Sequence, residues 1–437
     1  MNLPQILSLI LLVVILVLAV WRHVNIGLLG FSAAAIMVMA TTAIADSSDT
    51  NTVLSSKDVL SHFPGAIVTL LIGVSLLFAH LEKSGGLSWF TDQIYAKMGH
   101  RTNIVPWIGY FIGFAISTAG AFSTASITLL VPVIAALGRK HPRLFFICEM
   151  AAIIGANTGA LSPINPTGQV ILDAAKKAHV EYSPWLVWFL GMLISFVLVI
   201  ALQIVFQDKR VVETSDSKAP EKGFVLLKPI KQENGDNHQL QPFYAICSTI
   251  AVLIFLILVI FAKANVGLTA LTLAVIMMLF FTQQSKDFVK KIPWNAVVVI
   301  SGLLVFIGTM MQVNTMKAVE QGLLSMTSSK IALLFMLAYL TTFLSNVESS
   351  TLGVISLMIP MVFTIFGDSP QISLILTACA APAMLSVVNP IHIAGTLVVS
   401  VTEEKQQEMM FKRLLIIAFA TVPFFPGLAM IVPALMM

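Results

Sequence analysis

Long apolar runs recur along the whole chain, and they limit its possible folds more than any other feature. Examples are residues 6–20, 66–79, 186–206, 244–261 and 414–432. About twenty apolar residues in a helix cross the roughly 30 Å hydrocarbon core of a bilayer. The strands of a transmembrane barrel would alternate polar and apolar residues, and these runs do not. The pattern therefore predicts an all-α polytopic membrane protein that lies in a lipid bilayer.

Composition agrees with this interpretation and excludes other classes. Of the 437 residues, 57% are hydrophobic and only 11% are charged, whereas soluble domains carry about 25% charged residues. The net charge of +4 is dispersed, so nucleic acid is not an expected partner. The three cysteines, Cys148, Cys247 and Cys379, lie far apart inside apolar segments and form neither a disulfide framework nor a metal-binding spacing. We expect no cofactor.

The order of segments is repeated on the two sides of one polar stretch, residues 207–241, which we interpret as a cytoplasmic linker. Residues 25–28 (NIGL) recur as 265–268 (NVGL), and residues 161–166 (LSPINP) recur as 385–390 (LSVVNP). Repeated halves with interrupted helices at matching places are typical of secondary transporters, whose sites lie at the interface of the repeats.

Each repeat is predicted to contain five spanning helices and one re-entrant hairpin. The first repeat covers residues 1–206, with scaffold helices in 4–81, a hairpin in 103–138 and a broken helix in 144–175. The second covers residues 242–437, with the corresponding parts in 242–313, 330–366 and 371–397. Each hairpin segment is short for two complete crossings. Because the tips are rich in small and hydroxyl-bearing residues, we expect them near the midplane.

Basic residues indicate the orientation. Lys97 and Arg101 precede the first hairpin, and Arg139 and Lys140 follow it, so both of its ends are expected in the cytoplasm. Tracing the spans from there predicts ten crossings, two opposed hairpins and two external termini, which is an inverted-repeat topology.

The tips and the broken helices form the candidate transport site. Proline after each asparagine frees backbone carbonyls, and unwound backbone at membrane depth is tolerated only where it is buried in protein or lines a cavity. These carbonyls, with amide and hydroxyl oxygens, suit a hard cation such as Na⁺, while the N-termini of half-helices suit a carboxylate. Single Ser and Thr residues here could equally be packing contacts between helices. The predicted cation ligands are Ser162, Asn165, Glu348, Ser386 and Asn389.

The order and duplication of these motifs resemble the ion transporter superfamily, in particular the divalent anion/sodium symporters and, more closely, the malonate/dicarboxylate carriers. In that family, Ser-Asn-Thr triplets at the tips hold substrate carboxylates. The matching positions here are 122–124 (FST) and 350–352 (STL), so the hydroxyls are kept and the amide is absent unless Asn346 supplies it. The predicted substrate ligands are Ser123, Thr124, Thr167, Asn346, Ser350, Thr351, His392 and Thr396.

The resemblance also implies a homodimer in the inner (cytoplasmic) membrane, with the early spans as a scaffold and the hairpins as the moving part of an elevator. We expect a secondary active transporter of a small organic anion such as malonate, malate, succinate or citrate, coupled to Na⁺ or H⁺. A cation/proton antiporter that uses Glu348 is the alternative, although antiporters carry buried acidic pairs. No Gly-x-Ser-x-Gly, paired-aspartate or His-Glu-x-x-His motif occurs, so we expect no enzyme activity.

Overall fold

The structure is a computed structural model that describes residues 2–22, 24–44, 54–86, 104–138, 142–206, 242–327, 329–347, 351–386, 388–390 and 392–436. Within these ranges the regular structure is helical and no β-strand occurs, which confirms the predicted all-α class. The linker at 207–241 and two predicted site residues, Glu348 and Ser350, lie outside the described residues.

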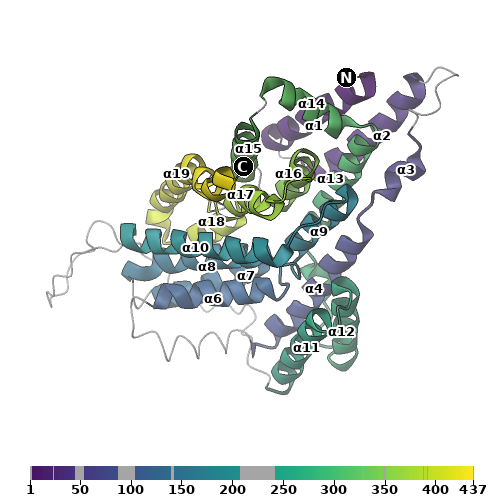
Figure 1. Cartoon of the computed structure of the whole chain (residues 1–437). Coiled ribbons are helices and arrows are strands. Elements are labelled where there is room, and N and C mark those ends of the chain that lie inside the picture. Colours follow the sequence, from purple (N-terminus) through teal and green to yellow (C-terminus); the bar gives the residue numbers. More distant parts are fainter. Residues whose placement is uncertain are drawn as a thin grey trace.

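The helices before the linker run in the order shown in Figure 1. They are α1 (Leu3–Arg22), α2 (Ile26–Ile44), α3 (Ser56–Ser61), α4 (Gly65–Lys83), α6 (Val105–Thr118), α7 (Ser123–Gly138), α8 (Pro142–Gly159), α9 (Pro166–Ala178) and α10 (Pro184–Phe206).

The helices after the linker begin with α11 (Pro242–Ile260) and include the short 3₁₀ helix η2. They continue as α12 (Val266–Phe280), η2 (Phe288–Lys291), α13 (Trp294–Gln312), α14 (Thr315–Met326), α15 (Lys330–Val347), α16 (Thr351–Phe366), α17 (Ile372–Leu385), α18 (Ile393–Val401) and α19 (Glu404–Met436).

The repeated NxGL motif sets the start of a helix in each half. Asn25 accepts a hydrogen bond from the backbone N–H of Gly27 at 2.9 Å, and Asn265 accepts one from Leu268 at 3.0 Å. An asparagine at this position satisfies one of the free N–H groups of the first helical turn. The motif therefore starts α2 and α12 by the same capping interaction.

Close glycine contacts pack these two helices against α13 and α4. A Cβ atom on Gly302 of α13 would lie 1.8 Å from the carbonyl oxygen of Gly27 in α2. A Cβ atom on Gly73 of α4 would lie 2.6 Å from the carbonyl oxygen of Gly267 in α12. Small residues let transmembrane helices approach this closely. Because Gly27 and Gly267 are the glycines of the repeated motif, the two halves make matching contacts.

The remaining helices show the same matching pattern. The hairpin α6–α7 packs on α8 and the hairpin arm α15 packs on α17, while α10 packs on α8 and α19 packs on α17. The short helices after the two breaks exchange partners between the halves, because α9 packs on α16 and α18 packs on α7.

Two groups of helices result from these contacts. The scaffold group consists of α1–α4 and α11–α14, and the hairpin group consists of α6–α10 and α15–α19. Figure 1 shows α4, α11 and α12 at the lower right and α6, α8 and α10 at the lower left. The groups meet mainly where α16 packs on α13 and α14 and where α9 packs on α4.

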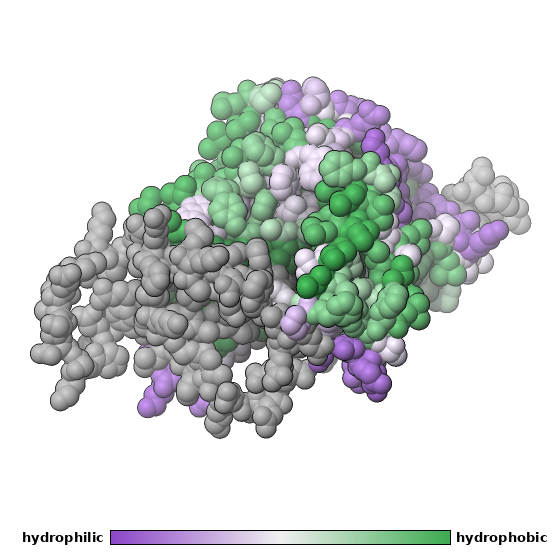
Figure 2. All heavy atoms as spheres, turned by 90° about the horizontal axis from the view of Figure 1, so that it is seen from below, coloured by the Kyte–Doolittle hydropathy of each residue, from purple (hydrophilic) through white to green (hydrophobic). Residues whose placement is uncertain are grey.

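Among the described residues, six segments are long and apolar enough to cross a membrane: α2, α3–α4, α10, α11, α13 and α19. The first arm of the first hairpin, α6, and both arms of the second, α15 and α16, are shorter apolar helices. Large apolar side chains remain exposed on the outer helices, for example Phe243 on α11 and Leu435 on α19. Figure 2 shows a broad hydrophobic surface with hydrophilic residues toward its margins. Exposed apolar surface of this extent marks a face that contacts lipid or another protein.

Candidate functional site

The tip of the first hairpin is a tight turn between α6 and α7. Gly120 adopts a φ of 116° there, a conformation that residues with a Cβ atom rarely adopt. The last carbonyl groups of α6 have no partner within the helix, as at any helix C-terminus. They must therefore be satisfied from outside α6.

Part of this requirement is met by the N–H groups of Gly120 and Ala121 in the turn, and the broken segment between α8 and α9 supplies further partners to the carbonyls of the tip. The side-chain amide Nδ2 of Asn165 donates to the carbonyl oxygens of Ser117 and Ala121, each at 2.8 Å. The hydroxyl of Ser162 donates to the carbonyl oxygen of Thr118 at 3.0 Å. The Oδ1 atom of Asn165 accepts from the backbone N–H of Thr167 at 3.0 Å and so caps α9. Both donors of Asn165 are occupied, which leaves a second lone pair on Oδ1 for a further ligand.

The second hairpin is joined to its broken helix in the same way. The Nδ2 atom of Asn389 donates to the carbonyl oxygen of Asn346 at 2.7 Å, and Nδ2 of Asn346 donates to the hydroxyl of Ser386 at 2.9 Å. The Oδ1 atom of Asn346 and the Oγ atom of the preceding residue, Ser345, are buried and have no hydrogen-bond partner among the residues that the structure describes. Buried polar oxygens normally have a partner, so these two atoms are available to a bound group.

A cavity of about 130 Å³ lies where the two tips and both broken helices meet the start of α13. Its polar lining includes five of the predicted substrate ligands, which are Ser123, Thr124, Thr167, Thr351 and His392. It also includes Asn157 and Asn295, which sequence reasoning missed. The apolar part of the lining comes from Phe122, Ile127, Pro293, Ala296, Leu352, Met384 and Ala394.

The first turns of five helices face this cavity. They belong to α7, α9, α13, α16 and α18, which begin at Ser123, Pro166, Trp294, Thr351 and Ile393. Each helix N-terminus carries roughly half a positive charge and free N–H groups, and so favours an anion. None of the described lining residues is Asp, Glu, Lys or Arg. An anion in this cavity would therefore be stabilised by helix dipoles rather than by charged side chains of the described lining.

One side-chain contact in the lining of this cavity joins the second hairpin to the segment before α18. The Oγ1 atom of Thr351, at the start of α16, lies 3.3 Å from Nε2 of His392, which precedes α18. Both side chains are buried. Since either partner can donate, depending on the imidazole tautomer, the pair can present a donor or an acceptor to a substrate.

The other predicted ligands have different positions. Thr396 donates its hydroxyl to the carbonyl oxygens of Pro390 and His392, both at 2.9 Å, and stabilises the break rather than lining the cavity. Asn346, near the end of α15, is 7% exposed and is not among the lining residues of the cavity.

The two missed residues had weak sequence signals. Asn157 is an amide in the largely apolar α8, and its Nδ2 is buried without a hydrogen-bond partner among the described residues. Asn295 follows Pro293 by two positions, at the start of a scaffold span, and its Oδ1 accepts a hydrogen bond from Asn25. Only the approach of α13 to the hairpin tips shows that it faces the cavity.

Comparison with known proteins agrees with the helical fold and with a transporter. Residues 14–380 match the profile of the CitMHS family, which is described as a citrate transporter family. No curated protein has significant sequence similarity to the chain. The fold is similar to the crystal structure of the YdaH transporter of Alcanivorax borkumensis, with a TM-score of 0.54 and 13% identity over 98% of this chain and 97% of that one.

Because the family profile covers most of the chain, the family is shown, and with it a multi-pass membrane protein that transports carboxylates and is not an enzyme. The predicted placement in the malonate/dicarboxylate branch receives no support from these comparisons. This chain belongs to the CitMHS family of citrate transporters.

Proposed function

We propose that the protein is a secondary active transporter that binds a small di- or tricarboxylate, such as malonate, malate, succinate or citrate, in the cavity between the two hairpin tips. The observation that carries the proposal is the convergence of five helix N-termini on one cavity. Carboxylate oxygens would accept hydrogen bonds from these N–H groups and from the hydroxyls of Thr124 and Thr351. Such dipoles hold an anion without a lysine or arginine, which would bind it more tightly and release it more slowly.

The coupling cation, Na⁺ or H⁺, would bind beside the anion. The buried oxygens of Ser345 and Asn346, which have no partner among the described residues, support a Na⁺ site at the second tip, close to Ser386. Hard cations prefer oxygen ligands such as amide carbonyls and hydroxyls. In the first half, the remaining lone pair of Asn165 Oδ1 could contribute to a matching site.

Alternating access would follow an elevator mechanism in which the hairpin group moves against the scaffold group. The dense packing of each hairpin on its broken helix supports movement as one body, and the interface between the groups involves few helices. In this proposal the two halves are inverted repeats with opposed hairpins, and the protein is a homodimer in the inner membrane, held through its scaffold helices.

Uptake into proteoliposomes tests the function. Radiolabelled malonate, malate, succinate and citrate would be offered under an imposed Na⁺ gradient or an imposed pH gradient. We expect one of them to accumulate under one of the two gradients, and Thr124→Val and Thr351→Val to abolish this uptake. The matched control is Thr249→Val in α11, whose hydroxyl donates to the carbonyl of Ala245 in its own helix and lies outside both cavity linings. If no anion accumulates while a Na⁺ gradient shifts the internal pH, the protein is a cation/proton antiporter instead.

A further inference from the structure

A second, larger cavity of about 290 Å³ adjoins the substrate cavity. The two share three lining residues, which are Phe122, Thr124 and Pro293. We call this larger space the outer cavity and the substrate cavity the inner cavity. The outer cavity lies between α4 of the scaffold group and the tip and first turns of α7 in the hairpin group. A solute that passes through it reaches Thr124, which faces both spaces.

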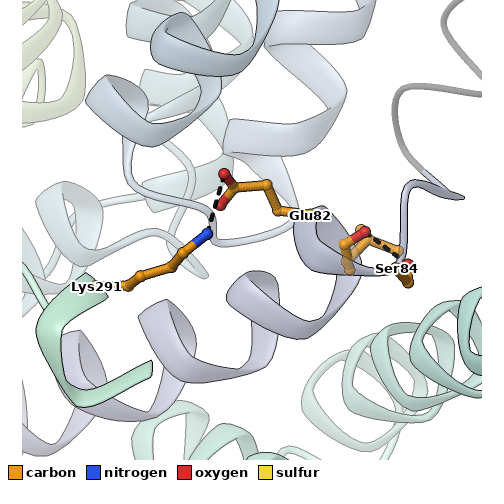
Figure 3. A network of polar contacts seen from close by, with 4 residues as sticks. Glu82, Ser84 and Lys291 are labelled. Atoms are coloured by element: carbon orange, nitrogen blue, oxygen red, sulfur yellow. Dashed lines mark hydrogen bonds and ion pairs between the residues drawn. The ribbon is translucent and has the colours of Figure 1, made fainter. Parts of the chain in front are cut away.

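One ion pair stands in the lining of this outer cavity. Nζ of Lys291, the last residue of η2, lies 3.2 Å from Oε1 of Glu82 near the end of α4. Figure 3 shows the two side chains pointing toward each other from separate elements. Their side chains are 36% and 42% exposed. Among the described lining residues, Lys291 is the only Lys or Arg and Glu82 the only acidic residue.

Both members of the pair belong to the scaffold group. Two residues beyond Glu82, the hydroxyl of Ser84 accepts a hydrogen bond from Ser248 of α11 at 3.0 Å. This bond fastens the end of α4 to the neighbouring scaffold helix. In the proposed elevator movement, Glu82 and Lys291 would both stay with the scaffold group while the hairpin tip moves past them.

We propose that the outer cavity is an access site for carboxylates, in which a substrate carboxylate replaces Glu82 as the partner of Lys291 before it moves to the inner cavity. The assignment rests on the proposed transport of carboxylates. In this proposal Lys291 is a substrate-binding residue that lies outside the hairpin tips and the helix breaks. It binds substrate that enters from one face of the membrane only.

Energetics favour such an exchange. A solvent-exposed ion pair is stabilised by about 0–1 kcal/mol, so a carboxylate of the substrate can displace Glu82 at little cost. Without Glu82, Lys291 would bind the anion more tightly and slow its passage to the inner cavity. Because Glu82 competes for the same ammonium group, it weakens this binding. Beyond Lys291 the inner cavity offers five helix N-termini, so the anion passes from one positive region to the next.

The experiment measures KM separately for substrate outside and inside the proteoliposomes, with the transported anion and the driving gradient found for the wild type. Lys291→Gln is expected to raise KM about threefold on the face to which the outer cavity opens. A change of this size corresponds to the loss of one exposed charge interaction. KM on the opposite face should stay unchanged. Because the imposed gradients fix the equilibrium of transport, kcat/KM should change by the same factor in both directions. Glu82→Gln should lower KM on the same face, and Lys291→Arg should restore the wild-type value.

Salt and a matched variant provide controls. The difference between Lys291→Gln and wild type should shrink as ionic strength rises, because the interaction is exposed. Lys290→Gln is the matched control, since Lys290 pairs with Asp287 and does not line the cavity. An equal change in KM on both faces, or no change on either, overturns the access site even though the wild type transports the anion. A wild type that transports no carboxylate would overturn the proposed function itself.

Discussion

The side-chain amide of Asn165 donates a hydrogen bond to the backbone carbonyl of Ala121, 2.8 Å away and 44 residues earlier in the chain. Asn389 makes the equivalent contact in the second half, with the carbonyl of Asn346. Each hairpin tip is thus held by the asparagine of an Asn-Pro element. The break in the helix and the end of the hairpin form one structural unit, on which the substrate cavity is built.

Asn165→Ala should destabilise the protein strongly. It removes two buried hydrogen bonds and the cap of α9, and at roughly 1 kcal/mol for each lost interaction the total is about 3 kcal/mol. Asn165→Asp keeps an acceptor for the cap but sets a carboxylate against two carbonyls, so it should be at least as harmful. Thermal unfolding in detergent measures both variants.

Asn265→Ala is the matched control for this prediction. It removes only the exposed cap of α12, at a cost of about 1 kcal/mol. If Asn165→Asp is as stable as the wild type, the amide donors do not hold the tip.

Asn157→Ala should weaken substrate binding and leave stability nearly unchanged. Asn157 lines the cavity, and its Nδ2 has no hydrogen-bond partner among the described residues, so the loss of this donor breaks no bond between them. We expect KM to rise about tenfold, the effect of losing one well-placed hydrogen bond of about 1.4 kcal/mol. Thr158→Val is the control, because Thr158 follows Asn157 directly and does not line the cavity. This variant loses the hydrogen bond from Thr158 to the carbonyl of Ile154, and its KM should equal that of the wild type. A lower melting temperature for Asn157→Ala, with KM unaltered, would assign this residue to packing.

Thr351 and His392 should act as a coupled pair. Their side chains are 3.3 Å apart, and each faces the same cavity. Contacting residues show interaction energies of about 0.5–3 kcal/mol in double-mutant cycles. We therefore expect the effects of Thr351→Val and His392→Ala on the apparent substrate affinity to be non-additive by about 1 kcal/mol. Additive effects would indicate that the two side chains contribute independently.

Gly120→Ala should destabilise the first hairpin tip. The φ of 116° at Gly120 costs a residue with a Cβ atom about 1–3 kcal/mol. Gly322→Ala in α14 provides the comparison, since a Cβ atom there meets no other atom within 4 Å and alanine favours a helix. We expect the melting temperature to fall for Gly120→Ala and to stay level or rise for Gly322→Ala. Equal melting temperatures would mean that the tip relaxes without cost.

Much of the local structure can be derived from the sequence. Long apolar runs predict helices because unpaired backbone groups cannot remain in lipid. The structure has α15 at Lys330–Val347 and α16 at Thr351–Phe366, within the segment predicted as the second hairpin. The Asn-Pro elements mark the breaks, since proline removes a donor and asparagine caps the next helix. These are interactions between neighbours in the chain, and a local pattern is enough to predict them.

The assembly of the site is a property of the tertiary structure. The sequence suggests His392 and Thr351 separately, and their contact depends on how α18 and α16 pack. Thr396 has the right residue type and neighbourhood for a ligand, yet its hydroxyl bonds to backbone of the break. Asn295 and Lys291 lie on a scaffold segment, so only the packing of that segment near the first hairpin brings them to the two cavities.

The sequence by itself determined the helical class, the membrane environment, the duplicated order of segments and the places where helices break. These follow from hydrophobicity and capping, which act over a few residues. Only the tertiary structure decided that five helix N-termini meet at one cavity and that Glu82 pairs with Lys291. Contacts between residues more than a hundred positions apart depend on helix packing, and the pattern of any single segment does not contain that information.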